Sequence, residues 1–165
     1  KILMNHHWQK IDLLTISYFV TEIPLYMNQK KKVLFVCTGN SCRSQMAEGI
    51  LRDMASDQFE VFSAGSHPSR VHPMSIAILA EWGIDISHHI SDSIDIYLNK
   101  GIDIVITVCD NANEICPVFS ECAQRIHWSI DDPFHGWDNE EQFKDRYRET
   151  RNDIKHRIQK FLQTE

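Results

Sequence analysis

The amino-acid sequence predicts an α/β fold in which a four-stranded parallel sheet carries helices on both faces. Short runs rich in Val, Ile and Phe alternate along the chain with longer segments whose apolar residues recur at helical spacing. Residues 103–108 are almost all β-branched, as expected for a parallel strand that is buried on both faces. Such a sheet needs helical crossovers between its strands, and the alternation supplies them.

The expected elements follow in strand and helix order. Strands are predicted at 32–37, 59–64, 103–108 and 124–130, and helices at 44–55, from Pro73 to about Trp82, at 91–99 and at 139–163; residues 109–121 should form a loop or weak helix. Ser44 is placed to cap the helix that it begins. Because the carboxyl ends of parallel strands share one edge of the sheet, residues that follow the strands should gather into one site.

Length and composition indicate one acidic globular domain. The chain has 165 residues, of which 42% are hydrophobic and 24% charged, with a formal net charge of −6. That charge argues against a general nucleic-acid surface. The five cysteines are odd in number and lack the spacing of a disulfide scaffold, so a reducing cytosol is the expected location.

The first thirty residues differ in character from the rest and are predicted to lie outside a domain that spans 31–165. The apolar stretch 11–27 is interrupted by Asp12, Glu22 and Pro24, which argues against a membrane span, and it lacks a signal cleavage site. Met27 stands just before a lysine run and the first strand, as a natural start would. Residues 1–26 are therefore interpreted as an upstream translated or vector-derived extension.

One short stretch between the first strand and the first helix has the features of an anion-binding loop. It consists of Cys37, Thr38, Gly39, Asn40, Ser41, Cys42, Arg43 and Ser44. Its length lets backbone N–H groups converge on one anion, and the following helix adds its positive N-terminal end. Such a cup stabilises a thiolate at Cys37, and Arg43 offers a planar fork to a tetrahedral oxyanion. The stretch thus predicts a nucleophile and a phosphate-like substrate together.

An acid is expected from the loop after the fourth strand. Thiolate attack on an oxyanion requires protonation of the leaving oxygen, which a carboxyl group opposite the cup can supply. Asp132 precedes Pro133, which restricts Asp132 to extended backbone conformations. Its neighbour Asp131 is interpreted as a turn residue, and taken alone the loop would allow that role for both. The strand-end argument favours Asp132.

Cys109 and Cys116 follow the third strand. In a regular helix their α-carbons would stand about 10 Å apart, whereas a disulfide needs less than about 7 Å. The intervening residues form helix poorly, so the segment can reorganise and pair the two thiols. Spacing alone does not decide between a mobile redox pair and ordinary buried cysteines. Metal binding by these thiols with Cys122 and His127 is disfavoured, because no CxxC spacing is present.

These motifs resemble those of the low-molecular-weight tyrosine phosphatase superfamily, and more narrowly the thiol-linked arsenate reductases built on that fold. The resemblance is carried by Val33 to Glu48, Thr107 to Asp110, Glu114 to Pro117, His127-Trp128 and Asp131 to Pro133. It runs from about residue 31 to the C-terminus. It implies the phosphatase-like fold and a cytoplasmic enzyme of arsenical resistance.

The resemblance implies a three-thiol relay. Cys37 would attack arsenate held by the loop and Arg43, and Asp132 would protonate the departing oxygen. Cys109 would then attack the adduct, releasing arsenite and leaving a Cys37–Cys109 disulfide. Cys116 would attack Cys109 and move the disulfide to the 109–116 pair, which thioredoxin or another thiol donor would reduce. No tightly bound cofactor is implied.

Two further features follow from the same resemblance. Ser44 would help to keep Cys37 as the thiolate, whereas Cys42 would take no part in the relay. Some relatives bind a potassium ion near the loop, and the residues here that match in kind are Asn40, Glu48, Ser63 and Asp92.

Two other functions remain open on the sequence. A phosphatase acting on phosphate monoesters would use only Cys37, Arg43 and Asp132, with Phe134 and Trp137 framing its cleft. An oxyanion- or redox-sensing module would not turn over arsenate at all. The histidines show no convincing ligand spacing, and His67 and His72 are expected in a surface loop.

Overall fold

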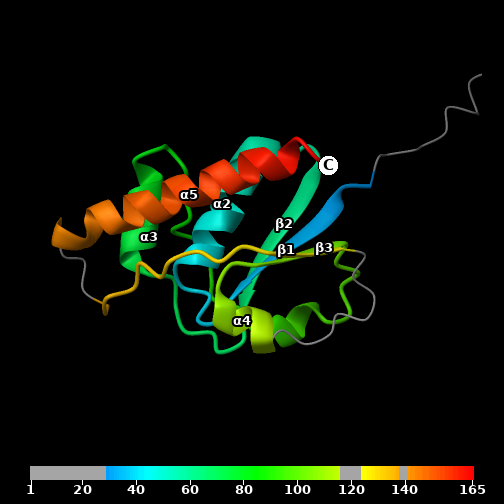
Figure 1. Ribbon diagram of the computed structural model, residues 1–165, viewed down its shortest axis with the longest axis horizontal. Helices are drawn as coiled ribbons and strands as arrows, with labels where there is room; N and C mark the ends of the chain where they lie inside the picture. Colours follow the sequence, from blue (N-terminus) through cyan, green and yellow to red (C-terminus); the bar gives the residue numbers. More distant parts are fainter. Residues whose placement is uncertain (1–28, 116–123, 138–140) are drawn as a thin grey trace, which may run out of the picture.

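Four parallel strands form the centre of the protein, as the sequence predicts (Figure 1). The computed structural model describes residues 29–115, 124–137 and 141–165. The strands are β1 (Lys31–Cys37), β2 (Phe59–Gly65), β3 (Ile104–Thr107) and β4 (Gln124–His127), in the order β2-β1-β3-β4. β1 is therefore flanked on both sides, and its apolar run from Val33 to Val36 is fully buried.

Helices cover this sheet on both sides. They are α2 (Arg43–Ala55), α3 (Pro73–Ala80), the short α4 (Asp110–Ile115) and α5 (Lys144–Leu162), with 3-10 turns at Ile94–Tyr97 and Glu141–Phe143. In Figure 1, α2, α3 and α5 lie together above the strands and α4 lies below them. α2 packs against β1, β2 and α5, which fixes the helix that follows the candidate anion loop.

Several element boundaries differ from the sequence-based expectations. β4 ends at His127 instead of residue 130, although the Trp128 N–H still donates to Thr107 O. α5 begins at Lys144, after a 3-10 turn, instead of at 139. α2 begins at Arg43, and Ser44 does not cap it. The expected weak helix after β3 is α4.

The core lies between the sheet and the α2–α5 layer. Its largest fully buried side chains are those of Phe35, Leu34, Met46, Ile50, Leu51, Met74, Ile78, Leu79, Ile86, Ile104, Ile106 and Tyr147. Each such apolar side chain stabilises the fold by about 1.5–3 kcal/mol relative to exposure. Phe35 also contacts Trp128 with ring centroids 5.9 Å apart, which ties the segment after β4 to the central strand.

The carboxyl ends of β1, β3 and β4 lie side by side. Val36 pairs with Thr107, and Thr107 pairs with His127. The residues that follow these strands include Cys37–Arg43, Cys109 and the Asp132 loop, so they meet at one edge, as predicted. Residues 1–28 and 116–123 lie outside the described residues. The separation of residues 1–30 from the domain stays a prediction.

Candidate active site

The loop between β1 and α2 is held in one shape by its own backbone and by β2. Asn40 has a φ of 44°, a left-handed conformation that asparagine tolerates better than most residues. Gly65 at the end of β2 packs directly against the loop: an added Cβ would lie 2.7 Å from Thr38 O and 2.9 Å from Asn40 N. Only glycine allows this close approach without a shift of the loop.

Two groups lie within hydrogen-bond distance of the Cys37 sulfur. The Asn40 N–H donates to Cys37 Sγ at 3.2 Å, and Ser44 Oγ lies 3.0 Å from the same sulfur. Asn40 Nδ2 donates to Ser44 Oγ, which leaves the hydroxyl proton of Ser44 free to point at the sulfur. These contacts suit a thiolate better than a thiol, because an anionic acceptor makes the stronger hydrogen bonds. Ser44 is thus a partner of the thiol and not a helix cap.

Asn40 is the centre of a buried polar network. Its amide nitrogen donates to Ser44 Oγ and to Ser63 Oγ, at 2.9 and 2.8 Å. Its side-chain oxygen accepts from the Asp92 N–H and from Gln45 Nε2, at 2.8 and 3.0 Å. The amide therefore uses all its hydrogen-bonding capacity, which fixes the loop that carries Cys37.

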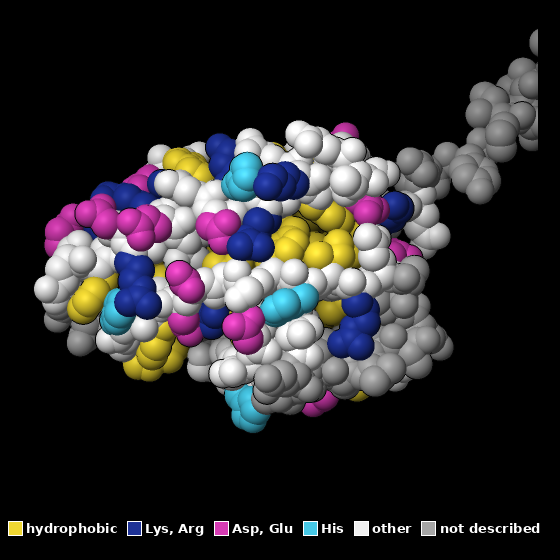
Figure 2. Space-filling view, viewed as in Figure 1, with side chains coloured by type: hydrophobic (Ala, Val, Ile, Leu, Met, Phe, Trp, Pro, Cys, Tyr) yellow, Lys and Arg dark blue, Asp and Glu magenta, His cyan; other side chains and the backbone are white. Residues whose placement is uncertain are grey.

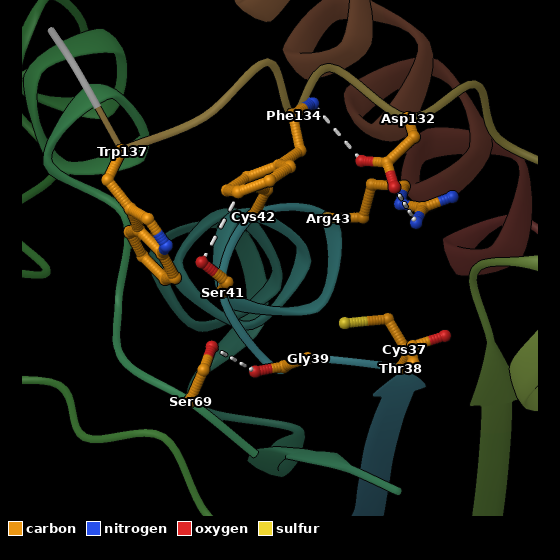
Figure 3. A pocket seen from close by; sticks show the side chains of 10 residues that line it. All are labelled: Cys37, Thr38, Gly39, Ser41, Cys42, Arg43, Ser69, Asp132, Phe134 and Trp137. Carbon is orange, nitrogen blue, oxygen red and sulfur yellow. Dashed lines mark hydrogen bonds and ion pairs between the residues drawn. The ribbon is translucent and has the colours of Figure 1, made fainter. Parts of the chain in front are cut away.

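Arg43 and Asp132 face each other across the mouth of the site (Figure 3). Arg43 Nη2 lies 2.7 Å from Asp132 Oδ2, and Arg43 Nη1 donates to Ile130 O at 2.9 Å. The Asp132 loop is also held by α5, because Arg146 Nη2 donates to Asp132 O at 2.7 Å. The side chain of Arg43 is 11% exposed and that of Asp132 is 53% exposed.

A cavity of about 190 Å³ lies between these groups (Figure 3). Its lining consists of Cys37, Thr38, Gly39, Ser41, Cys42, Arg43, Ser69, Asp132, Phe134 and Trp137. At about 30 Å³ per water, the cavity has room for roughly six waters, enough for a tetrahedral oxyanion. The lining includes Asp132 and not Asp131, and the role of Asp132 as the acid stays a prediction.

Cys109 follows β3 and lies beside the loop. Its sulfur is 3.6 Å from Thr38 Oγ1 and accepts from the Ala112 N–H at 3.4 Å, so it caps the start of α4. The residue is buried, 3% exposed. Cys37 and Cys109, which are far apart in the sequence, thus both lie at the carboxyl edge of the sheet. The expected partner thiol Cys116, like Cys122, lies outside the described residues.

Cys42 is part of the cavity lining, but its thiol is buried beside Tyr147 of α5. Burial raises the pKa of its thiol, and its sulfur lies 3.6 Å from the Tyr147 hydroxyl. A thiol with a raised pKa is a poor nucleophile at neutral pH. The absence of Cys42 from the thiol relay stays a prediction.

The four residues suggested for potassium lie close together in the Asn40 network. Ser63 Oγ donates to Glu48 Oε2 at 2.6 Å, and Asp92 contacts Asn40 through its backbone N–H. Burial raises the pKa of Glu48, and the charge of Asp92 raises it further. Within the described residues, no group of three or more His, Cys, Asp and Glu side chains is arranged to hold a metal ion.

Two histidines have roles that the sequence did not indicate. His72 is buried instead of lying in a surface loop: its Nδ1 accepts from the Met74 N–H and caps α3, so its Nε2–H donates to Gly136 O at 2.7 Å. Its position just before Pro73 was the available signal for a cap. His89 contacts Gln45 and Arg52, and burial lowers its pKa to about 4.

Comparison with known proteins identifies the family. The family model for the low molecular weight phosphotyrosine protein phosphatases matches residues 32–165. The chain belongs to this family. Within the phosphatase family, an arsenate reductase from Halalkalibacterium halodurans is 41% identical over 135 residues, which cover 82% of this chain and 97% of the relative.

Solved structures of the phosphatase family agree. An arsenate reductase in the phosphate binding state superposes with a TM-score of 0.69 at 34% identity, covering 81% of this chain and 98% of that one. The thioredoxin-dependent arsenate reductase of Corynebacterium glutamicum superposes with a TM-score of 0.65 at 29% identity, covering 82% of this chain and 61% of that one. The resemblance drawn from the motifs is thus confirmed. No helix in the described part of the chain is long and apolar enough to cross a membrane.

Proposed function

We propose that this protein is an arsenate reductase that converts arsenate to arsenite by a thiol relay and serves arsenic detoxification. The observation that carries the proposal is the position of Cys109. A hydrolytic phosphatase needs the loop, Arg43 and Asp132, whereas a second buried thiol beside the nucleophile loop serves a redox reaction. The arsenate reductases among its relatives support the same choice.

The first step joins arsenic to Cys37. The oxyanion is held by the backbone N–H groups of the loop, from Thr38 to Ser44, and by Arg43. The Cys37 thiolate attacks arsenic(V), one oxygen departs, and Asp132 supplies the proton that lets it leave as water. An anion on Arg43 displaces the Asp132 carboxyl group from the guanidinium, which frees it to face the departing oxygen.

The second step transfers two electrons. Cys109, as the thiolate, attacks the sulfur of the Cys37 adduct. A Cys37–Cys109 disulfide forms, the S–As bond breaks, and its electron pair stays with arsenic, which leaves as arsenite. Cys116 then attacks Cys109, frees Cys37, and gives a Cys109–Cys116 disulfide. Thioredoxin or another dithiol donor reduces that bond, as the name of the C. glutamicum relative suggests. This relay needs no tightly bound cofactor. It does need a reducing compartment, which supports a cytoplasmic location.

The test replaces Cys109 by serine. We expect Cys109→Ser to lose arsenate reduction with thioredoxin, thioredoxin reductase and NADPH by at least about 10³-fold, since the electron pair has no route to arsenic. Hydrolysis of p-nitrophenyl phosphate, which needs only the loop and the acid, should persist and reports that the site is intact. Unchanged arsenate reduction in this variant would reject the relay.

The outer thiol needs a separate test. After one turnover without reductant, mass spectrometry should find a disulfide between Cys109 and Cys116. A bond between Cys116 and Cys122, or no bond, would contradict the proposed order.

A phosphatase activity on aryl phosphates is the second candidate. It is favoured by Phe134 and Trp137, which line the cavity while 39% and 37% exposed. Aromatic walls above an anion loop suit the ring of an aryl phosphate, whereas arsenate has no apolar part to contact. Comparison of kcat/KM for the two substrates in one preparation discriminates these functions.

A further inference from the structure

The four side chains suggested for a potassium ion already have protein partners. Asn40 Oδ1 accepts two N–H groups, Ser63 Oγ donates to Glu48 Oε2, and an Asp92 carboxylate oxygen accepts from the Tyr97 hydroxyl at 3.0 Å. The second Glu48 oxygen is paired with Arg52. Oxygens that ligate a cation point lone pairs at the ion, and here at least one oxygen of each side chain faces a hydrogen-bond donor. The residues therefore do not fit a bound potassium ion.

Arg52 brings a positive charge to the same place. It lies one turn along α2 from Glu48, and its Nη2 contacts Glu48 Oε1 and donates to Val61 O at 2.9 Å. Its other terminal nitrogen, Nη1, lies 2.9 Å from His89 Nε2. The guanidinium is thus held in three directions, and its partner carboxylate is largely buried, 12% exposed. A buried carboxylate needs such a counter-charge to stay ionised.

Two hydrogen-bonded routes lead from Arg52 to the nucleophile loop. One passes through Glu48 and Ser63 to the amide of Asn40. The other passes through His89 and Gln45: the guanidinium of Arg52 can only donate, so His89 accepts at Nε2 and its Nδ1–H donates to Gln45 Oε1.

Both routes meet at Asn40. Gln45 Nε2 donates to the side-chain oxygen of Asn40, and Ser63 contacts its amide nitrogen. The Asn40 backbone N–H then donates to Cys37 Sγ. Loss of charge balance at Arg52 should therefore disturb the residue that orients the thiol.

We propose that Arg52 is the resident counter-cation of this network, a positioning residue that makes the enzyme independent of potassium. Arg52 touches neither substrate nor the reacting atoms. Its guanidinium pairs with the Glu48 carboxylate and, through the two routes, holds Asn40 from two sides. Removing its side chain leaves Glu48 Oε1 and Val61 O without the cation that they contacted, and this opened space becomes a site for a monovalent cation.

The experiment compares the full-length protein with Arg52→Ala, Arg52→Lys and a matched control, Arg157→Ala. Arg157 forms the same i,i+4 ion pair, with Asp153 on α5, but does not line the Cys37 cavity. The melting temperature of each protein is measured at pH 8 in about 100 mM KCl and in choline chloride of equal ionic strength.

Only Arg52→Ala should respond to potassium. We expect its melting temperature to rise by about 3 °C or more in KCl, because an ion that binds only the folded state stabilises it. The starting protein, Arg52→Lys and Arg157→Ala should shift by less than about 1 °C, since each keeps a cation on Glu48. Isothermal titration with KCl should show saturable binding to Arg52→Ala alone.

Activity gives an independent readout. In choline chloride, Arg52→Ala should lose about tenfold in kcat/KM for arsenate, and KCl should restore most of it, as expected for a misplaced loop that the ion repositions. A potassium response of the starting protein, or none in Arg52→Ala by melting and titration, would overturn the proposal. The two binding readouts need no turnover, so failure of arsenate reduction in every protein would instead count against the proposed function.

Discussion

Asp132 Oδ2 lies 2.7 Å from Arg43 Nη2, so the candidate proton donor and the candidate oxyanion holder form an ion pair. An incoming oxyanion competes with Asp132 for the same guanidinium fork. Asp132 is the exposed partner on a loop, whereas Arg43 is anchored to Ile130 O, so binding should move Asp132 and leave Arg43 in place. We therefore expect substrate binding and release of the acid from Arg43 to occur as one event.

Asp132→Asn tests the acid role. The amide keeps the shape of the side chain but supplies no acidic proton, so we expect kcat for arsenate to fall by about 10²–10⁴-fold. Affinity for inorganic phosphate should not fall, because the variant removes a negative charge that competes for Arg43. The measurements are rapid-quench single turnover and phosphate titration. Equal losses in both would show that Asp132 only shapes the loop.

Ser44→Ala tests the contact with the nucleophile. Ser44 Oγ lies 3.0 Å from the sulfur, and one hydrogen bond to a charged group contributes about 1.5–3 kcal/mol, so the rate of Cys37 alkylation by iodoacetamide at pH 7 should fall by roughly 10- to 100-fold. Mass spectrometry follows this rate. Ser87→Ala, at an exposed serine outside the cavity lining, is the control and should alkylate at the starting rate.

His72→Ala tests the link between α3 and the segment after Asp132. The variant removes the cap on the Met74 N–H, the hydrogen bond to Gly136 O and the stacking on Trp137. We expect the free energy of unfolding to fall by about 2 kcal/mol, measured by urea titration. His67→Ala, at an exposed histidine whose ring lies within hydrogen-bond distance of its neighbour Ser66, should change the free energy of unfolding by less than about 0.5 kcal/mol.

His89 predicts a pH dependence of stability. Burial lowers its pKa from 6.5 to about 4 in the folded protein, while in the unfolded chain it stays near the ordinary value. Between these values the unfolded state binds more protons, so stability falls as the pH drops from 6.5 to 4, and below 4 this loss is complete. The side chain is only 5% exposed, and the loss should reach about 2–3 kcal/mol.

Urea titrations at several pH values between these limits measure this slope. His89→Gln cannot titrate and should flatten it, whereas His156→Gln, at an exposed histidine on α5, should leave it unchanged. A slope that persists in His89→Gln would assign the pH dependence to other groups.

The sequence was sufficient where local pattern and strand direction decide position. The loop from Cys37 to Ser44 lies between a strand and a helix. Its position was predictable because an apolar strand-like run precedes it and apolar residues at helical spacing follow it. Asp132 and Cys109 reach the loop because parallel strands end at one edge. Cys109 Sγ lies 3.6 Å from Thr38 Oγ1, and the parallel direction of β1 and β3 is enough to explain this closeness.

The sequence was insufficient where side chains from distant segments meet. The partners of Arg52 include His89, which is 37 residues away, and no spacing rule links them. The helix pattern alone suggested Ser44 as a cap, whereas the family resemblance implied a role beside Cys37, and its hydroxyl lies 3.0 Å from that sulfur. His72 appeared exposed because its stacking partners Trp137 and Tyr147 come from other elements.

The cap that Cys109 provides for α4 ties the chemistry of the thiol to the folding of a helix. The sulfur that accepts the Ala112 N–H is the one that the relay would convert to a disulfide. A cap contributes about 1 kcal/mol, and α4 has only six residues. Oxidation of Cys109 should therefore destabilise the helix. By thermodynamic reciprocity, the stability of α4 then enters the reduction potential of the disulfide, at about 20 mV for each kcal/mol. The stability of this short helix should thus contribute to the reduction potential of the disulfide that Cys109 forms.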